Sequence, residues 1–159
     1  MIFDAILRRL REGVVINKIP KNSIICDIGC GSHAHFLKKL SIGRQIRYGF
    51  GFDKEIAEYN DSKIALKEID IDKENIPLKN NSVDVATLLA VLEHLENPQH
   101  VLEEIFRILK IDGSLLLTTP SQKSKKMLES LAFKMKIINK KDILEHKNYF
   151  TPLTIKEFL

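Results

Sequence analysis

The sequence predicts an α/β fold, in which a doubly wound parallel β-sheet is covered by helices on both faces. Short apolar runs alternate along the chain with longer segments whose apolar residues recur at helical spacing. Apolar residues make up 44% of the 159 residues and charged residues 29%, the balance of a globular domain rather than a disordered chain. No internal repeat or low-complexity linker interrupts the pattern, so we expect a single domain over residues 1–159.

The elements follow in a regular order along the chain. Residues 1–19 predict an amphipathic N-terminal helix from the spacing of Ile2, Phe3, Ile6, Leu7, Leu10 and Val14. Charged residues interrupt this segment, so it is not a secretory signal. Apolar runs predict strands at 23–28, 46–53, 65–72, 83–92 and, after a tight turn, 112–120. Residues 34–41 predict a helix that opens directly after two glycines.

The clearest helix is predicted over residues 97–110. Asn97 can cap it and Pro98 suits its first turn. Its inner stripe is predicted to contain Val101, Leu102, Ile105, Phe106, Ile108 and Leu109. We expect right-handed crossovers between the parallel strands and the strand order 3-2-1-4-5.

Candidate functional residues fall at the carboxyl ends of the predicted strands. In sheets of this kind, ligands bind at those ends, beside the first strand. The residues placed there are Asp27, Gly29, Gly31, Asp53, Asp72, Glu93, His94 and Ser121.

The turn GCGSHA (29–34) matches the nucleotide-binding pattern G-x-G-x-x-G/A, with Ala34 in the last place. Asp53 follows Gly29 by 24 residues, close to the spacing of an acid that binds a ribose. The pattern fits either a nicotinamide or flavin dinucleotide or S-adenosylmethionine. Asp27 favours the second ligand, because its carboxylate would repel a pyrophosphate but could hold an ammonium group.

Several segments together resemble the class I S-adenosylmethionine-dependent methyltransferases. DIGCGS (27–32) resembles their first motif, and GFD (51–53) resembles their second acidic strand end. The block from 72 to 120 is similar to the central block of the small-molecule (type 11/12-like) branch of that family. HKNYFTPLTIKEFL (146–159) resembles the segment that introduces the late helix of that branch. The resemblance spans residues 20–159 and implies a Rossmann-like sheet.

The resemblance implies a role for each matching residue. The turn of Gly29, Cys30 and Gly31 would let the methionine part of S-adenosylmethionine approach the backbone. Asp27 would lie near the amino group of that ligand and Asp53 would bind its ribose hydroxyls. Asp72, rather than Asp70, would accept a hydrogen bond from the adenine amine.

Three histidines need separate comment. His33 stands where family members usually have glycine, and we expect it to be tolerated if its side chain points away. His33 and His35 have no further nameable ligands, so we predict no metal site. On the acceptor side, beside Glu93, His94 is the candidate catalytic base; alternatively it is a loop histidine that shapes the pocket or hydrogen-bonds Glu93.

Composition and charge bear on partners and compartment. Cys26 and Cys30 are predicted to be small buried hydrophobic residues in a cytoplasmic protein, and no apolar run is long enough for a membrane span. Residues 120–150 contain eight lysines and three acidic residues, and we favour a solvated face over a nucleic-acid surface there. The motif of amino-methylating enzymes, an Asn/Asp-Pro-Pro-aromatic run, is absent. This argues against adenine in DNA as the methyl acceptor. We therefore expect a small-molecule, lipid or sugar acceptor.

The C-terminal segment leaves two questions open. Residues 20–120 would form the cofactor-binding core, and 121–159 an acceptor-side segment with a helix that begins at Thr151. Family members usually continue into a strand pair that completes a seven-stranded sheet, so we expect an open sheet edge and a possible dimer through it. A fragment that binds S-adenosylmethionine without turnover, or an NAD-dependent oxidoreductase, are the alternative functions.

Overall fold

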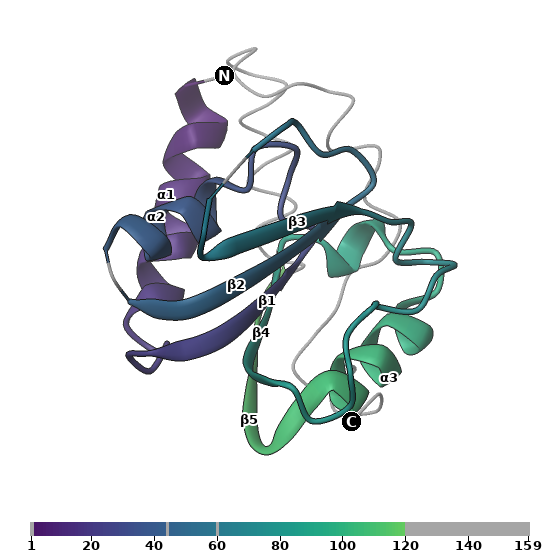
Figure 1. Ribbon diagram of the computed structural model, residues 1–159. Helices are drawn as coiled ribbons and strands as arrows, with labels where there is room; N and C mark the ends of the chain where they lie inside the picture. Colours follow the sequence, from purple (N-terminus) through teal and green to yellow (C-terminus); the bar gives the residue numbers. More distant parts are fainter. Residues whose placement is uncertain (1, 44, 60, 120–159) are drawn as a thin grey trace, which may run out of the picture.

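The computed structural model describes residues 2–43, 45–59 and 61–119 and shows one parallel sheet with the strand order β3-β2-β1-β4-β5 (Figure 1). The predicted fold class and strand order are confirmed. The predictions for Ser121, for the lysine block and for the helix from Thr151 lie outside the described residues. The strands are Ser23–Ile28 (β1), Ile46–Asp53 (β2), Ile64–Glu68 (β3), Val83–Leu89 (β4) and Leu109–Thr118 (β5).

Helices cover both faces of the sheet, with α1 and α2 on one face and α3 on the other (Figure 1). Each face has its own apolar core, one built with α3 and one with α2 and the end of α1. Residues of β5 alternate between the two cores, because Leu115 and Leu117 pack toward α3 and Leu116 toward α2. The helices are Ile2–Ile16 (α1), His35–Ile42 (α2), Pro98–Ile108 (α3) and a short 3-10 helix, Leu92–His94 (η1).

Strands β1 and β2 have the predicted bounds, but the other three do not. β3 ends at Glu68, since its last partner is Asp53 at the end of β2, so Asp72 lies beyond the strand. β4 ends at Leu89 because Ala90 takes a positive φ of 58° and turns the chain into η1. β5 begins at Leu109, directly after α3, and its pairing with β4 is irregular between Leu109 and Ser114, beside the position of the predicted tight turn.

Two predicted helix faces are partly wrong. In α1, Leu10 and Val14 are 63% and 65% exposed, whereas Glu12 and Val15 point into the protein. In α3, Phe106 is 46% exposed, because the stripe that faces the sheet is centred on Leu102 and Ile105 and is complete without it. The predicted cap of α3 is confirmed: the Asn97 side chain accepts a hydrogen bond from the backbone of His100.

Candidate functional site

The glycine turn after β1 is tied to the end of β2. The backbone N–H groups of Gly29 and Cys30 both donate to the carbonyl oxygen of Phe52, at 2.8 and 3.1 Å. Gly29 and Gly31 have φ values of 71° and 72°, in the left-handed region that favours glycine. This pairing sets the turn directly beside Asp53, the last residue of β2.

The two glycines of the turn have different roles. A Cβ atom on Gly29 would lie 2.3 Å from Cγ2 of Val91, so this glycine allows close packing against the segment after β4. A Cβ atom on Gly31 would meet nothing within 4 Å. Gly31 is therefore the glycine whose open side a ligand can approach, which refines the equal roles expected from the sequence.

Asp53 closes the glycine turn from the side of β2. Its Oδ2 accepts a hydrogen bond from the Gly31 N–H at 2.8 Å, and its Oδ1 accepts one from the Lys54 N–H at 2.8 Å. A carboxylate has about four acceptor positions, so each oxygen retains one for another donor. The side chain is partly exposed at the mouth of the turn. Asp53 can thus accept the hydrogen bond that holds the glycine turn and, at the same time, accept hydrogen bonds from two hydroxyl groups.

Asp27 lies in β1, just before the turn, and is only 2% exposed. Its Oδ1 accepts a hydrogen bond of 2.5 Å from the hydroxyl of Thr87 on β4. Burial raises the pKa of Asp27 to about 7, although the Thr87 hydrogen bond acts in the opposite direction. A buried carboxylate poised near neutral pH can pair with a cationic group and be neutral in its absence.

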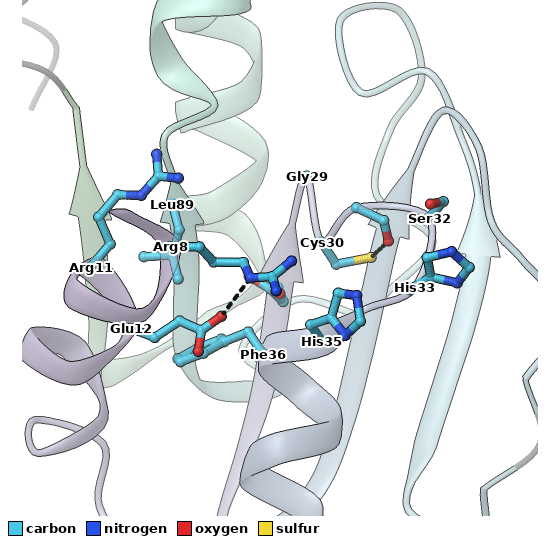
Figure 2. Close-up of a pocket in the computed structure, with 12 residues that line it drawn as sticks. Arg8, Arg11, Glu12, Gly29, Cys30, Ser32, His33, His35, Phe36 and Leu89 are labelled. Atoms are coloured by element: carbon cyan, nitrogen blue, oxygen red, sulfur yellow. Dashed lines mark hydrogen bonds and ion pairs between the residues drawn. The ribbon is translucent and has the colours of Figure 1, made fainter. Parts of the chain in front are cut away.

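A cavity of about 310 Å³ opens over the glycine turn (Figure 2). One wall comes from α1, through Arg8, Arg11 and Glu12, and Leu89 at the end of β4 also lines it. Glu12 is 5% exposed and forms ion pairs with Arg8 at 3.7 Å and with Lys39 at 3.2 Å. Two arginines of the N-terminal helix therefore line the cavity next to the glycine turn. The sequence analysis did not assign them to the site. The other lining residues are Asp27, Gly29, Cys30, Gly31, Ser32, His33, His35 and Phe36.

His33 does not distort the turn. Its side chain is exposed, and its ring lies 5.6 Å from the ring of His35 (Figure 2). The positive φ at this end of the turn, 45°, belongs to Ala34, which is fully buried and precedes α2 rather than lying inside it as predicted. Within the described parts of the chain, no group of three or more His, Cys, Asp or Glu side chains could hold a metal ion.

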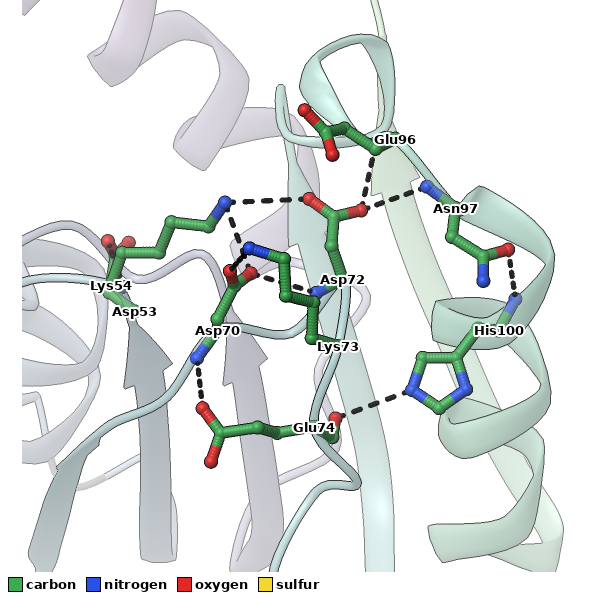
Figure 3. Close-up of polar contacts among 9 residues, drawn as sticks. All are labelled: Asp53, Lys54, Asp70, Asp72, Lys73, Glu74, Glu96, Asn97 and His100. Carbon is green, nitrogen blue, oxygen red and sulfur yellow. Dashed lines mark hydrogen bonds and ion pairs between the residues drawn. The ribbon is translucent and has the colours of Figure 1, made fainter.

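Asp72 is buried at 8% exposure and links two segments near the end of β2 (Figure 3). Its Oδ1 accepts hydrogen bonds from the backbone N–H groups of Glu96 and Asn97, at 2.8 and 3.0 Å. Its Oδ2 lies 3.6 Å from Nζ of Lys54. Asp72 therefore fixes the start of α3, and Oδ2 is the oxygen with more capacity for a ligand.

Lys54 joins the two acids that the sequence assigned to the nucleoside. It directly follows Asp53, and its ammonium group pairs with Asp70 at 3.1 Å as well as with Asp72 (Figure 3). Asp70 also pairs with Lys73, and the two lysines lower the pKa of Asp70 to about 2. Both oxygens of Asp70 thus form ion pairs with lysines. This agrees with the choice of Asp72, rather than Asp70, as the candidate ligand-binding acid.

Glu93 and His94 lie in η1, beyond the end of β4. Glu93 is 1% exposed, and neither of its carboxylate oxygens has a hydrogen-bond partner. Burial raises the pKa of Glu93, while its own backbone N–H, the charge of His94, the nearby Thr119 hydroxyl and the charge of Arg11 act in the opposite direction. His94 is exposed. The structure thus places both predicted acceptor-side residues at the same end of the sheet as the glycine turn.

The sequence analysis did not identify some residues of the candidate site. Thr87 left a signal, because it is a hydroxyl residue within the otherwise apolar run VATLL of a buried strand. Lys54 left one too, as a cation directly after a candidate ligand-binding acid. For Arg8 and Arg11 the sequence offers no signal beyond their charge, since only the packing of α1 brings them next to the glycine turn.

Comparison with known sequences gives a consistent result. The sequence model of a family described as a methyltransferase domain matches residues 2–159. The tRNA U34 carboxymethyltransferase of Helicobacter acinonychis is 30% identical over 114 residues, covering 62% of this chain and 41% of that protein. The enzyme of the same name from Helicobacter pylori is 28% identical over 128 residues, covering 69% and 46%. This chain thus spans less than half the length of these curated relatives.

Solved structures share the fold. A methyltransferase in complex with the Trm112 methyltransferase activator of Haloferax volcanii superposes with a TM-score of 0.71 at 20% identity, covering 95% of this chain and 66% of that one. A SAM-dependent methyltransferase from Archaeoglobus fulgidus gives a TM-score of 0.70 at 20% identity, covering 96% and 65%. At this level of identity, the likeness concerns the arrangement of strands and helices.

Proposed function

This chain belongs to the methyltransferase domain family, and on that premise we propose that it binds S-adenosylmethionine at the glycine turn and transfers a group from it to an RNA acceptor. The family match and the solved relatives agree with the resemblance to class I S-adenosylmethionine-dependent methyltransferases in the sequence. Their fold is the one that this chain adopts.

The observation that carries the proposal is the hydrogen bond from the Gly31 N–H to Oδ2 of Asp53, at 2.8 Å. It puts an acid with spare acceptor positions next to a glycine whose side toward the cavity is open. A molecule with vicinal hydroxyls and a chain that must lie close to backbone fits this pair. The ribose and methionine parts of S-adenosylmethionine have those two features.

The remaining residues fit the two ends of the same ligand. At the amino-acid end, Asp27 would pair with the ammonium group and Arg8 with the carboxylate, since both line the cavity. At the adenine end, Oδ2 of Asp72 would accept from the exocyclic amine. Both ends of the cofactor thus meet groups of complementary charge or hydrogen-bonding type.

The sulfonium of the cofactor supplies an electrophilic carbon, so the protein has mainly to position the acceptor in line with it. Packing of Val91 against Gly29 holds the segment after β4 close to the turn. His94 follows that segment and is the residue proposed to take a proton from the acceptor, if the acceptor must lose one.

An RNA acceptor is supported by the names of two relatives, which act on U34 of tRNA. The eight lysines of residues 120–150 provide cations that suit a phosphate backbone. These observations favour RNA over the small-molecule acceptor expected from the sequence. The relatives' names also raise the question of whether a methyl or a carboxymethyl group is transferred.

Titration calorimetry with S-adenosylmethionine, S-adenosylhomocysteine and NAD tests the cofactor. We expect the first two to bind and NAD not to bind; binding of NAD alone would overturn the proposal. Incubation with unmodified tRNA, with isotopically labelled S-adenosylmethionine or its carboxylated form as donor, then tests transfer. Label in tRNA with one donor identifies the transferred group, and binding without any transfer would indicate a cofactor-binding fragment.

A further inference from the structure

Glu12 is a buried acid in α1 to which the proposed function gives no role. Its side chain lines the cavity over the glycine turn, together with Arg8 of the same helix. A buried charge costs free energy unless it is paired, and an apolar side chain of similar size would avoid that cost. An acid at this place therefore indicates a role beyond packing.

Each carboxylate oxygen of Glu12 faces a different cation. Oε2 accepts a hydrogen bond from Nζ of Lys39, in α2, at 3.2 Å. Oε1 lies 3.7 Å from Nε of Arg8, which precedes Glu12 by one helical turn and lies on the same face of α1. This ion pair involves the Nε side of the guanidinium, whose other N–H donors are on its terminal nitrogens.

The two cations differ in their relation to the cavity. Arg8 lines the cavity and its side chain points toward the glycine turn, whereas Lys39 is not among the lining residues (Figure 2). The Arg8 side chain is 46% exposed, and an unpaired arginine with that freedom would adopt several rotamers. The ion pair with a buried acid therefore restricts the guanidinium to the cavity side.

We propose that Glu12 is a positioning residue that holds the guanidinium of Arg8 in place for the carboxylate of the cofactor's amino-acid end. This inference rests on the proposed function and concerns a residue that acts through Arg8 rather than on the ligand. Glu12 would hold Nε, and the ligand's carboxylate would accept from the terminal nitrogens. Such a pairing depends on the orientation of the planar guanidinium, so a loss of orientation weakens it.

The test measures binding of S-adenosylhomocysteine and of 5′-methylthioadenosine, which lacks the amino-acid group, by titration calorimetry at pH 8. Glu12→Gln keeps the shape of the side chain but removes its charge. We expect it to bind S-adenosylhomocysteine about threefold more weakly than the wild type, the size of effect typical of a partly exposed ion pair. The affinity for 5′-methylthioadenosine should stay unchanged.

A double-variant cycle shows whether Glu12 acts through Arg8. In the Arg8→Ala background, Glu12→Gln should cause no further loss of S-adenosylhomocysteine affinity. Any effect of the Glu12 charge on Asp27 or on the ligand's ammonium group would persist in that background, so the cycle separates it from the positioning of Arg8. Glu12→Met, which also removes the charge, should give the same results and keeps the test independent of one substitution.

Lys39→Met is the matched control, because Lys39 pairs with the same acid but does not line the cavity. We expect it to leave S-adenosylhomocysteine affinity unchanged, with urea unfolding confirming that each variant is folded. A loss as large as in Glu12→Gln would show that Glu12 acts by joining α1 to α2, and would overturn the proposal.

Three other results would also decide the matter. Unchanged S-adenosylhomocysteine affinity in Glu12→Gln, or an equal loss for both ligands, would refute the positioning role. A further loss in the Arg8→Ala background would mean that Glu12 acts independently of Arg8, and would refute it too. Absence of S-adenosylhomocysteine binding in the wild-type chain would instead overturn the proposed function itself.

Discussion

Thr87 and Asp27 lie side by side on neighbouring strands and share a hydrogen bond of 2.5 Å, with both residues buried. This contact explains the presence of a hydroxyl residue in an otherwise apolar strand. It also orients the carboxyl group of Asp27, whose second oxygen is left for another partner. The pair therefore prepares a carboxylate at the amino-acid end of the proposed cofactor site.

The first prediction concerns the pH dependence of stability. Because burial raises the pKa of Asp27 to about 7 from an ordinary value of 3.8, its contribution to stability is complete below about pH 4 and is lost as the pH rises through 7. The Asp27→Asn variant does not lose stability in this way, because asparagine does not ionise. We expect the variant to gain about 2–4 kcal/mol over the wild type between pH 5 and pH 8.

Urea unfolding of both proteins at several pH values measures that difference, with the shared titration of other groups cancelling. Parallel stability curves for the two proteins would contradict the pKa assignment. In the wild type, S-adenosylhomocysteine should bind more tightly as the pH rises through 7, because the ionised carboxylate pairs with the ligand's ammonium group. Asp27→Asn should lose this pH dependence.

The second prediction separates two acids by their effects. Asp53→Ala should weaken S-adenosylhomocysteine by about 1.5–3 kcal/mol, because a charged hydrogen-bond acceptor is lost. Asp72→Ala should weaken the ligand less, but should destabilise the fold by about 1–3 kcal/mol, since two backbone N–H groups lose their partner. Calorimetry and urea unfolding on both variants measure the two effects. Unchanged affinity in both variants would mean that the nucleoside lies elsewhere.

The third prediction compares two neighbours in the turn. His33 has an ordinary backbone, so His33→Gly should lose about 0.5–1 kcal/mol of stability through a more flexible unfolded chain. Ala34 has a φ of 45°, and a left-handed residue other than glycine carries a strain of about 1–2 kcal/mol. Ala34→Gly relieves that strain but removes a buried methyl group, so its stability should stay within about 0.5 kcal/mol of the wild type.

In the same experiment, His33→Gly should bind S-adenosylhomocysteine as well as the wild type or better. Urea unfolding ranks the two variants, and calorimetry gives the affinity. A large loss of affinity in His33→Gly would make this histidine part of the binding site. A loss of stability in Ala34→Gly larger than in His33→Gly would show that the left-handed backbone is not strained.

The extent to which the fold follows from local pattern differs between elements. β1 and β2 have the predicted bounds, because β1 is a buried run, β2 is a partly buried one, and each ends at a position recognisable in the sequence. The apolar alternation after β3 continues through Ile69 and Ile71, which are buried, yet the strand ends at Glu68 because β2 offers no backbone partner beyond Asp53. Pairing partners, which no local pattern contains, set that end.

The candidate site shows the same division. The glycine turn and Asp53 were predictable, since the positive φ values of Gly29 and Gly31 favour glycine and Asp53 directly ends the apolar run of β2. The inward face of α1 was not predictable from the sequence. Leu10 and Val14 belong to the apolar stripe but are exposed, whereas Glu12 and Val15 are buried. Glu12 is held there by ion pairs with Arg8 and Lys39, and Lys39 comes from a different helix.

The last prediction tests the contribution of α1 to cofactor binding. Arg8 lines the cavity, whereas its neighbour Arg9 is exposed and does not. Arg8→Ala should weaken S-adenosylhomocysteine by about 1 kcal/mol, a modest effect because the guanidinium is partly exposed. Arg9→Ala is the control and should leave the affinity unchanged. Binding of 5′-methylthioadenosine, which lacks the amino-acid group, should be the same in Arg8→Ala and the wild type. If both ligands lose affinity equally in Arg8→Ala, the arginine acts through packing of α1 rather than on the ligand's carboxylate.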